Sequence, residues 1–156
     1  MLKHLFFSVF LGLALLFSTP SYSFTNTNDS KQIECLARNA YFEARGEGER
    51  GIIAVTHVVL NRTNDKRSRF GTTPCAVVHQ KTKGHCQFSW VCKTQTITNY
   101  SLYTKCKEIV KAVYYKQHSD NTNGALFYHA KYVSGSWFKS KLMRTVQIGS
   151  HIFYKG

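Results

Sequence analysis

The residues best suited to chemistry lie in one short stretch, Tyr41 to Glu47, which holds two carboxylates four positions apart. Apolar residues precede it at helical spacing, so the stretch is predicted to lie at the C-terminal end of a helix. The helix dipole there disfavours another negative charge, and Tyr41 and Phe42 could shield Glu43 from water. Both effects raise the pKa of Glu43, as a general acid that stays protonated near neutral pH requires.

The spacing alone also fits a plainer interpretation, and taken by itself it favours it. Glu43 would then be a solvated carboxylate at a helix end, paired with Arg45 or Arg50. Arg45, if it folds back, lowers the pKa of Glu43. Glu47 follows one helical turn later and is predicted either to shape or bind a sugar site or to be a surface charge. The glycines on both sides of Glu47 argue against a rigid pair of carboxylates.

The elements that must position these residues are mainly helices, followed by short strands. Asp29 and Gln32 resemble a capping box that opens the first helix. Its apolar stripe is Ile33, Leu36, Ala37, Ala40, Tyr41 and Ala44. Further helices are predicted over 49–62, 74–80 and 98–117, and strands over 126–128, 146–148 and 151–154. Repeats and dividing linkers are absent from the sequence, so we predict one small α+β domain with a short C-terminal β-element.

The first 23 residues have the features of an export signal. Lys3 and a following apolar run of about 13 residues, too short for a membrane span, lead to Pro20 and small residues before a cleavage point after Ser23. We predict a signal peptide over 1–23, a flexible start over 24–32 and a catalytic domain over 33–156; an uncleaved anchor is the alternative.

The charge balance is strongly basic. The chain carries 21 Lys and Arg against 8 Asp and Glu, a net charge of +13. Such a surface prefers polyanions without specifying which. Since an exported protein meets the carboxylates and phosphates of the cell envelope, we expect anionic envelope polymers as partners and no nucleic acid. A basic nucleic-acid-binding protein fits the charge but not the signal peptide.

All five cysteines, Cys35, Cys75, Cys86, Cys92 and Cys106, follow the predicted signal peptide. In an oxidising compartment they predict one or two disulfides and one remaining thiol. The pair most easily joined is Cys86 with Cys92, and spacing does not settle the connectivity. C-x-x-C and H-E-x-x-H motifs are absent from the sequence, so disulfides rank above a metal site.

Several sequence blocks resemble the cell wall hydrolase family of the spore-cortex-lytic type. They occur in the family's order and cover the chain from about residue 33 to its end. The blocks are Cys35–Glu47, Ile53–Val55, Val58–Arg62, Cys86–Trp90, Gly124–Ala130, Ser136–Trp137 and Ile148–Phe153.

This resemblance implies a lysozyme-like domain that cleaves peptidoglycan between N-acetylmuramic acid and N-acetylglucosamine by lytic transglycosylation. Glu43 matches the family's catalytic glutamate. Residues in the matching blocks are candidate sugar contacts: Glu47, Gln87, Phe88, Tyr128, His129 and Trp137. Aromatic residues in a small domain are also often core, and Asn61 and Arg62 are predicted to brace the second helix. We expect a monomer without cofactor or metal.

Two other functions remain open at this stage. Hydrolysis to reducing ends would need a second carboxylate, with Glu47 the nearest candidate. A non-catalytic envelope-binding protein would keep the fold while Glu43 does no chemistry, although the intact block around Glu43 argues against it.

Overall fold

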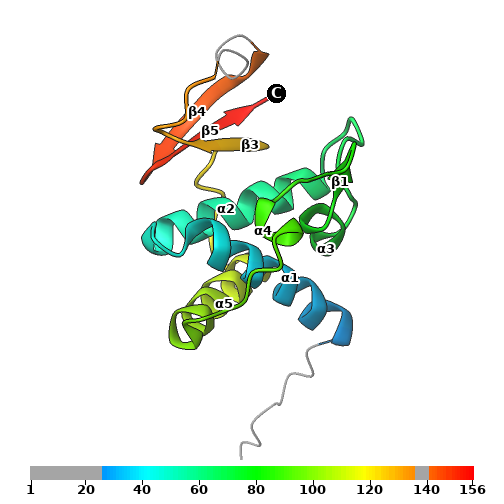
Figure 1. Cartoon of the computed structure of the whole chain (residues 1–156), viewed down its shortest axis with the longest axis vertical. Coiled ribbons are helices and arrows are strands. Elements are labelled where there is room, and N and C mark those ends of the chain that lie inside the picture. Colours follow the sequence, from blue (N-terminus) through cyan, green and yellow to red (C-terminus); the bar gives the residue numbers. More distant parts are fainter. Residues whose placement is uncertain (1–25, 136–140) are drawn as a thin grey trace, which may run out of the picture.

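The structure is a computed structural model that describes residues 26–135 and 141–156. The protein has a helical body with a three-stranded sheet at one end (Figure 1). The elements are α1 Thr27–Ala44, α2 Gly48–Thr63, α3 Pro74–Val78, β1 Lys81–Thr82, β2 His85–Cys86, α4 Ser89–Cys92, α5 Tyr100–Tyr114, β3 Phe127–Ala130, β4 Met143–Ile148 and β5 His151–Lys155. No helix within these ranges is long and apolar enough to cross a membrane. The predicted signal peptide lies outside the described residues.

Helix α1 begins earlier than predicted. Asn26 is its N-cap, and residues 27–32, which the sequence assigned to a flexible start over 24–32, are helical. Asp29 is not the cap but lies in the first turn, where its charge still favours the helix. The side chain of Gln32 is buried and accepts a hydrogen bond from the backbone N–H of Cys75 at 3.0 Å. The Asn26 side chain caps the helix locally, and the contact between Gln32 and Cys75 joins the start of the helix to a distant segment.

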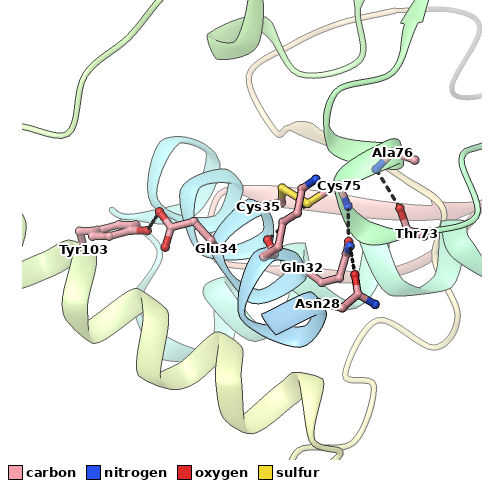
Figure 2. Close-up of a disulfide and its surroundings, with 9 residues drawn as sticks. Asn28, Gln32, Glu34, Cys35, Thr73, Cys75, Ala76 and Tyr103 are labelled. Carbon is pink, nitrogen blue, oxygen red and sulfur yellow. Dashed lines mark hydrogen bonds between the residues drawn. A yellow bond between two sulfur atoms is a disulfide. The ribbon is translucent and has the colours of Figure 1, made fainter. Parts of the chain in front are cut away.

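The main core lies between α1, α2 and α5, with α3 closing one side. The whole predicted stripe of α1 is buried. A disulfide between Cys35 and Cys75, a pairing the sequence had left open, joins the middle of α1 to α3 (Figure 2). On the other side of α1, Glu34 accepts hydrogen bonds from Tyr103 and Lys107 of α5. Covalent and polar contacts therefore fix α1 on both sides.

A second disulfide closes a small loop near the end of α1. It joins Cys86 to Cys92, as predicted, and the loop contains α4. Just before this loop, β1 and β2 pair as a two-stranded antiparallel hairpin, which the sequence did not predict. Cys106 is buried on α5 as a free thiol.

The C-terminal sheet packs on α2. Its strand order is β3-β5-β4, with both pairs antiparallel. Ala54 and Val58 of α2 form a second apolar cluster with Ala125, Ile148 and Phe153. Because side chains alternate along a strand, one face of β3 points toward the helices and the other points away. The α+β class and the mainly helical character are confirmed.

Candidate active site

Glu43 is the last residue but one of α1, and it lines a cavity of about 260 Å³. Three separate parts of the chain supply the other walls, namely the end of α2, the 86–92 loop and β3. The lining residues are Glu43, Arg62, Gln87, Phe88, Ser89 and Tyr128. The cavity therefore forms only where the helical body, the disulfide loop and the sheet meet.

Tyr128 holds the Glu43 carboxyl in place. Its hydroxyl donates a hydrogen bond to Oε2 of Glu43 at 3.1 Å. Burial, followed by the proximity of Glu43, raises the pKa of Tyr128 well above its usual value. The phenol therefore stays protonated and remains a donor across the neutral pH range.

The electrostatics of Glu43 match those of a general acid. Burial raises its pKa, while the hydrogen bond from Tyr128 and the charge of Arg62 act in the opposite direction. Arg45 does not pair with Glu43: its Nη1 donates to the Tyr41 hydroxyl at 3.2 Å and its guanidinium lies over the Tyr41 ring. Glu43 makes no ion pair within the described residues, so the interpretation as a solvated, paired carboxylate is wrong.

Arg62 also lines this cavity, a position that was not predicted from the sequence. It was predicted to brace α2, and its Nε does donate to the carbonyl of Leu126 at 2.7 Å. Its side chain is also only 4 % exposed and lies on the wall that faces Glu43. The available signal was its position at the end of a helix that is apolar nearly all round, where a long cation has little access to water.

The 86–92 loop is fastened to α1 by aromatic contacts. Phe42 stacks on Trp90 with 4.8 Å between ring centroids, and the Trp90 indole N–H donates to Asn39 at 3.0 Å. Gln87 and Phe88, the candidate sugar contacts of this loop, both line the cavity. Gln87 is exposed and free to meet a ligand, whereas the Phe88 ring is buried 5.4 Å from the Arg62 guanidinium. The buried Phe88 ring therefore packs against the Arg62 guanidinium and is not exposed for stacking on a sugar.

Glu47 lies outside the cavity and has a structural contact. Its carboxylate accepts hydrogen bonds from the backbone N–H of Ser150, at 2.7 Å, and from the Ser150 hydroxyl. These two bonds lower the pKa of Glu47. Both carboxylate oxygens therefore fasten the α1–α2 turn to the β4–β5 turn, and this geometry leaves Glu47 poorly placed as a partner for Glu43.

One further predicted contact, His129, is not brought to Glu43. His129 follows Tyr128 on β3 and therefore faces the other side of the sheet. Its ring stacks on Tyr154 and is hydrogen-bonded to the Tyr154 hydroxyl at 2.8 Å. The prediction that His129 shares the groove of Tyr128 does not agree with this geometry. Trp137 lies outside the described residues.

The model of the cell wall hydrolase family matches residues 46–154. The chain belongs to the cell wall hydrolase family. This membership confirms the resemblance carried by the sequence blocks. No curated protein matches the chain.

Two solved structures resemble this cell wall hydrolase. One is the catalytic domain of the germination-specific lytic transglycosylase SleB from Bacillus anthracis, with 27 % identity and a TM-score of 0.63 over 88 % of this chain and 99 % of that one. The other is the catalytic domain of the Bacillus cereus SleB protein, with 25 % identity and a TM-score of 0.61 over 85 % of this chain and 100 % of that one.

The carboxylates of this cell wall hydrolase can be placed completely, because all eight Asp and Glu residues lie in the described ranges. Glu43 is the one that lines the cavity. The other seven bond to other groups or are exposed at the surface. They are Asp29, which bonds to Tyr114; Glu34, to Tyr103; Glu47, to Ser150; Asp65, to Arg69; Asp120, to Asn61; and the exposed Glu49 and Glu108. Across the described ranges, no group of His, Cys, Asp and Glu is arranged to hold a metal ion.

Proposed function

We propose that this cell wall hydrolase cleaves the glycan strands of peptidoglycan by lytic transglycosylation between N-acetylmuramic acid and N-acetylglucosamine, with Glu43 as both general acid and general base. Family membership and the likeness to a lytic transglycosylase catalytic domain support the reaction class. The matched family segment begins three residues after Glu43. The role of Glu43 therefore rests on its geometry and on the sequence block around it.

A single observation carries the choice between transglycosylation and hydrolysis: one carboxyl group, and no second one, lines the cavity formed by the described residues. Hydrolysis by the common pathways needs a second carboxylate, about 5–5.5 Å away to act as a nucleophile or about 6.5–9.5 Å away to activate water. The nearest candidate in sequence, Glu47, is held by Ser150 instead. A reaction that uses one group twice fits this site better.

The steps balance without water. Protonated Glu43 donates its proton to the glycosidic oxygen while the bond from C1 of N-acetylmuramic acid to that oxygen breaks, and the electron pair leaves with the oxygen. C1 becomes an oxocarbenium-like centre. The Glu43 carboxylate then takes the proton of the C6 hydroxyl as O6 bonds to C1. The products are a 1,6-anhydro end and a free 4-hydroxyl, and Glu43 is protonated again.

Product analysis in water enriched in ¹⁸O tests this proposal. The protein is incubated with purified peptidoglycan, and the released fragments are examined by mass spectrometry. We expect 1,6-anhydro ends, which are one water lighter than reducing ends, with no enzyme-dependent incorporation of ¹⁸O. Reducing ends labelled with ¹⁸O would instead establish a hydrolase and require a second group. The absence of cleavage from several wall types would favour a binding protein.

We further propose that the protein is exported, with cleavage after Ser23, and acts at the cell wall. The Cys35–Cys75 and Cys86–Cys92 disulfides support this location, because such bonds persist in oxidising compartments. Peptidoglycan, the proposed substrate, lies in the same compartment. A surface of the protein that attaches to the wall would keep the enzyme close to this substrate.

A basic hollow supports attachment to anionic groups of the wall. This second cavity, of about 900 Å³, includes four exposed cationic residues: Lys66, Arg67, Lys141 and Lys155. Its acidic member, Asp65, is already paired with Arg69 at 2.9 Å. Leu126 lines this basic hollow while its carbonyl accepts the Arg62 hydrogen bond, so the hollow adjoins the active-site cavity. Carboxylates on the peptide stems of the substrate are suitable ligands.

Neutralising the basic hollow is expected to weaken wall binding. The triple variant Lys66→Gln, Arg67→Gln, Lys155→Gln should sediment less with insoluble peptidoglycan, with affinity reduced about tenfold at low salt and less at high salt. A matched control removes three exposed cations of the α5 region, Lys105, Lys111 and Lys116. Equal losses in both triple variants, or an equal loss on glycan strands stripped of peptide stems, would argue against a specific role for the hollow.

A further inference from the structure

Arg62 is a buried cation without an anionic partner. Only 4 % of its surface is exposed, and within the described residues no carboxylate forms an ion pair with its guanidinium. Isolated buried charges are costly, since they lose hydration without a compensating interaction. A protein keeps such a charge only where the surroundings hold it firmly, so the surroundings of Arg62 are informative.

The guanidinium is held by one carbonyl and three aromatic rings. Nε donates to Leu126, and the guanidinium carbon lies 5.0, 5.4 and 5.9 Å from the ring centroids of Phe70, Phe88 and Phe127. These contacts support a cation through the ring faces without neutralising it. Nη1 is buried and has no hydrogen-bond partner. The charge is therefore fixed in position and uncompensated on the cavity side.

The cavity side is where Glu43 lies. Both residues line the same small cavity, and each acts electrostatically on the other. Burial lowers the pKa of Arg62 to about 10, with Tyr128 and Glu43 acting in the opposite direction, so the guanidinium is still charged at neutral pH. Tyr128, which donates the hydrogen bond to Glu43, is protonated, and burial lowers the pKa of His151, whose ring lies 5.1 Å from the Tyr128 ring.

We propose that Arg62 is a positioning residue of the reaction, whose fixed charge stabilises the carboxylate that Glu43 becomes when it releases its proton. Before transfer, Glu43 is neutral and the charge of Arg62 is unbalanced. After transfer, the cavity contains a carboxylate, the guanidinium and the oxocarbenium-like sugar. A charge already in place requires no reorganisation at the moment of transfer, which is how electrostatic stabilisation is most effective.

The two effects on Glu43 are then complementary. Burial favours the protonated form of the carboxyl and raises its pKa, whereas the charge of Arg62 acts in the opposite direction. This inference rests on the proposed function of Glu43, but it makes a separate claim about how the acidity of Glu43 is set.

The test compares Arg62→Gln and Arg62→Met, which remove the charge, with Arg62→Lys, which keeps it. Activity requires protonated Glu43, so kcat/KM on soluble glycan strands falls as pH rises through the Glu43 pKa. Removing the charge is expected to raise that pKa and move the fall to higher pH by about one unit. It should also lower kcat/KM about 10- to 100-fold. Arg62→Lys should retain the wild-type position of the fall and part of the rate.

A titration of the Glu43 side-chain carboxyl by ¹³C NMR gives a readout independent of activity, with Glu43→Gln assigning the signal. The Glu43 pKa should be higher in the folded neutral variants than in wild type and Arg62→Lys. An unchanged Glu43 pKa in a folded neutral variant would overturn the proposal, and so would failure of both neutral variants to fold, which would make Arg62 structural. A wild-type protein that cleaves no glycan would instead contradict the proposed function, while the titration would still decide the effect of Arg62.

Discussion

Glu43→Gln is expected to lower the rate of glycan cleavage about 10³- to 10⁴-fold, the upper range for loss of a general acid–base group. The reason is that the proposed reaction uses the same carboxyl in both steps, and no other carboxylate lines the cavity to replace it. An amide keeps the shape of the side chain but neither donates a proton to the glycosidic oxygen nor accepts one from the C6 hydroxyl. Release of soluble fragments from purified peptidoglycan gives the measurement.

Stability measurements distinguish loss of chemistry from loss of fold. Burial raises the pKa of Glu43, so the native state at neutral pH disfavours its ionised form more than the unfolded chain does. Replacing it by a neutral amide removes that penalty, and Glu43→Gln should therefore unfold at a temperature no lower than wild type. An inactive variant with a clearly lower Tm would leave the loss of activity attributable to damage to the fold.

Two other glutamates provide matched controls. Glu49→Gln changes an exposed carboxylate outside the cavity and should leave both cleavage and Tm unchanged. Glu47→Gln removes a charged acceptor of Ser150 and should cost about 1–2 kcal/mol of stability, with at most a several-fold loss of activity. A loss in Glu47→Gln as deep as that in Glu43→Gln would mean that two carboxylates act and would reopen the hydrolytic mechanism.

The parts of the fold that could be predicted from the sequence are those with a strong local period. The stripe of α1 and the apolar run of α2 are both long enough for their spacing to indicate a helix. The first turn of α1 was missed because Asp29 was predicted to be the cap, whereas the Asn26 side chain accepts the capping hydrogen bond from the backbone N–H of Asn28. The hairpin of β1 and β2 was not predicted because strands of two residues carry no detectable alternation.

In the site, too, local features could be predicted from the sequence and long-range contacts could not. Glu43 could be singled out from its helix end and its aromatic neighbours, which are local features. Its hydrogen bond to Tyr128 and its proximity to Arg62 depend on where β3 and the end of α2 meet, and spacing does not supply that. Successive side chains of a strand point to opposite faces of the sheet. The sequence alone could therefore have predicted that Tyr128 and His129 lie on different faces of β3.

Removing the Cys35–Cys75 disulfide is expected to have the largest effect on stability. The two cysteines are 40 residues apart, and opening a loop of that length increases the entropy of the unfolded chain by an amount worth about 4 kcal/mol. That is a large part of the 5–15 kcal/mol typical of a domain. Cys35→Ala with Cys75→Ala should lower Tm by roughly 10–15 °C, measured by calorimetry.

The second disulfide gives the matched comparison, because it closes a much shorter loop in a different place. Cys86 and Cys92 are six residues apart, so their removal should cost only about 2 kcal/mol. Their loop nevertheless carries Gln87 and Phe88, which line the cavity, and holds Trp90 against Phe42. Removing this pair should therefore reduce cleavage at a temperature where the protein is still folded, whereas removing Cys35–Cys75 should leave cleavage by the folded fraction nearly unchanged. The reverse pattern would mean that the 86–92 loop serves the fold and α3 serves the site, contrary to the arrangement of the cavity.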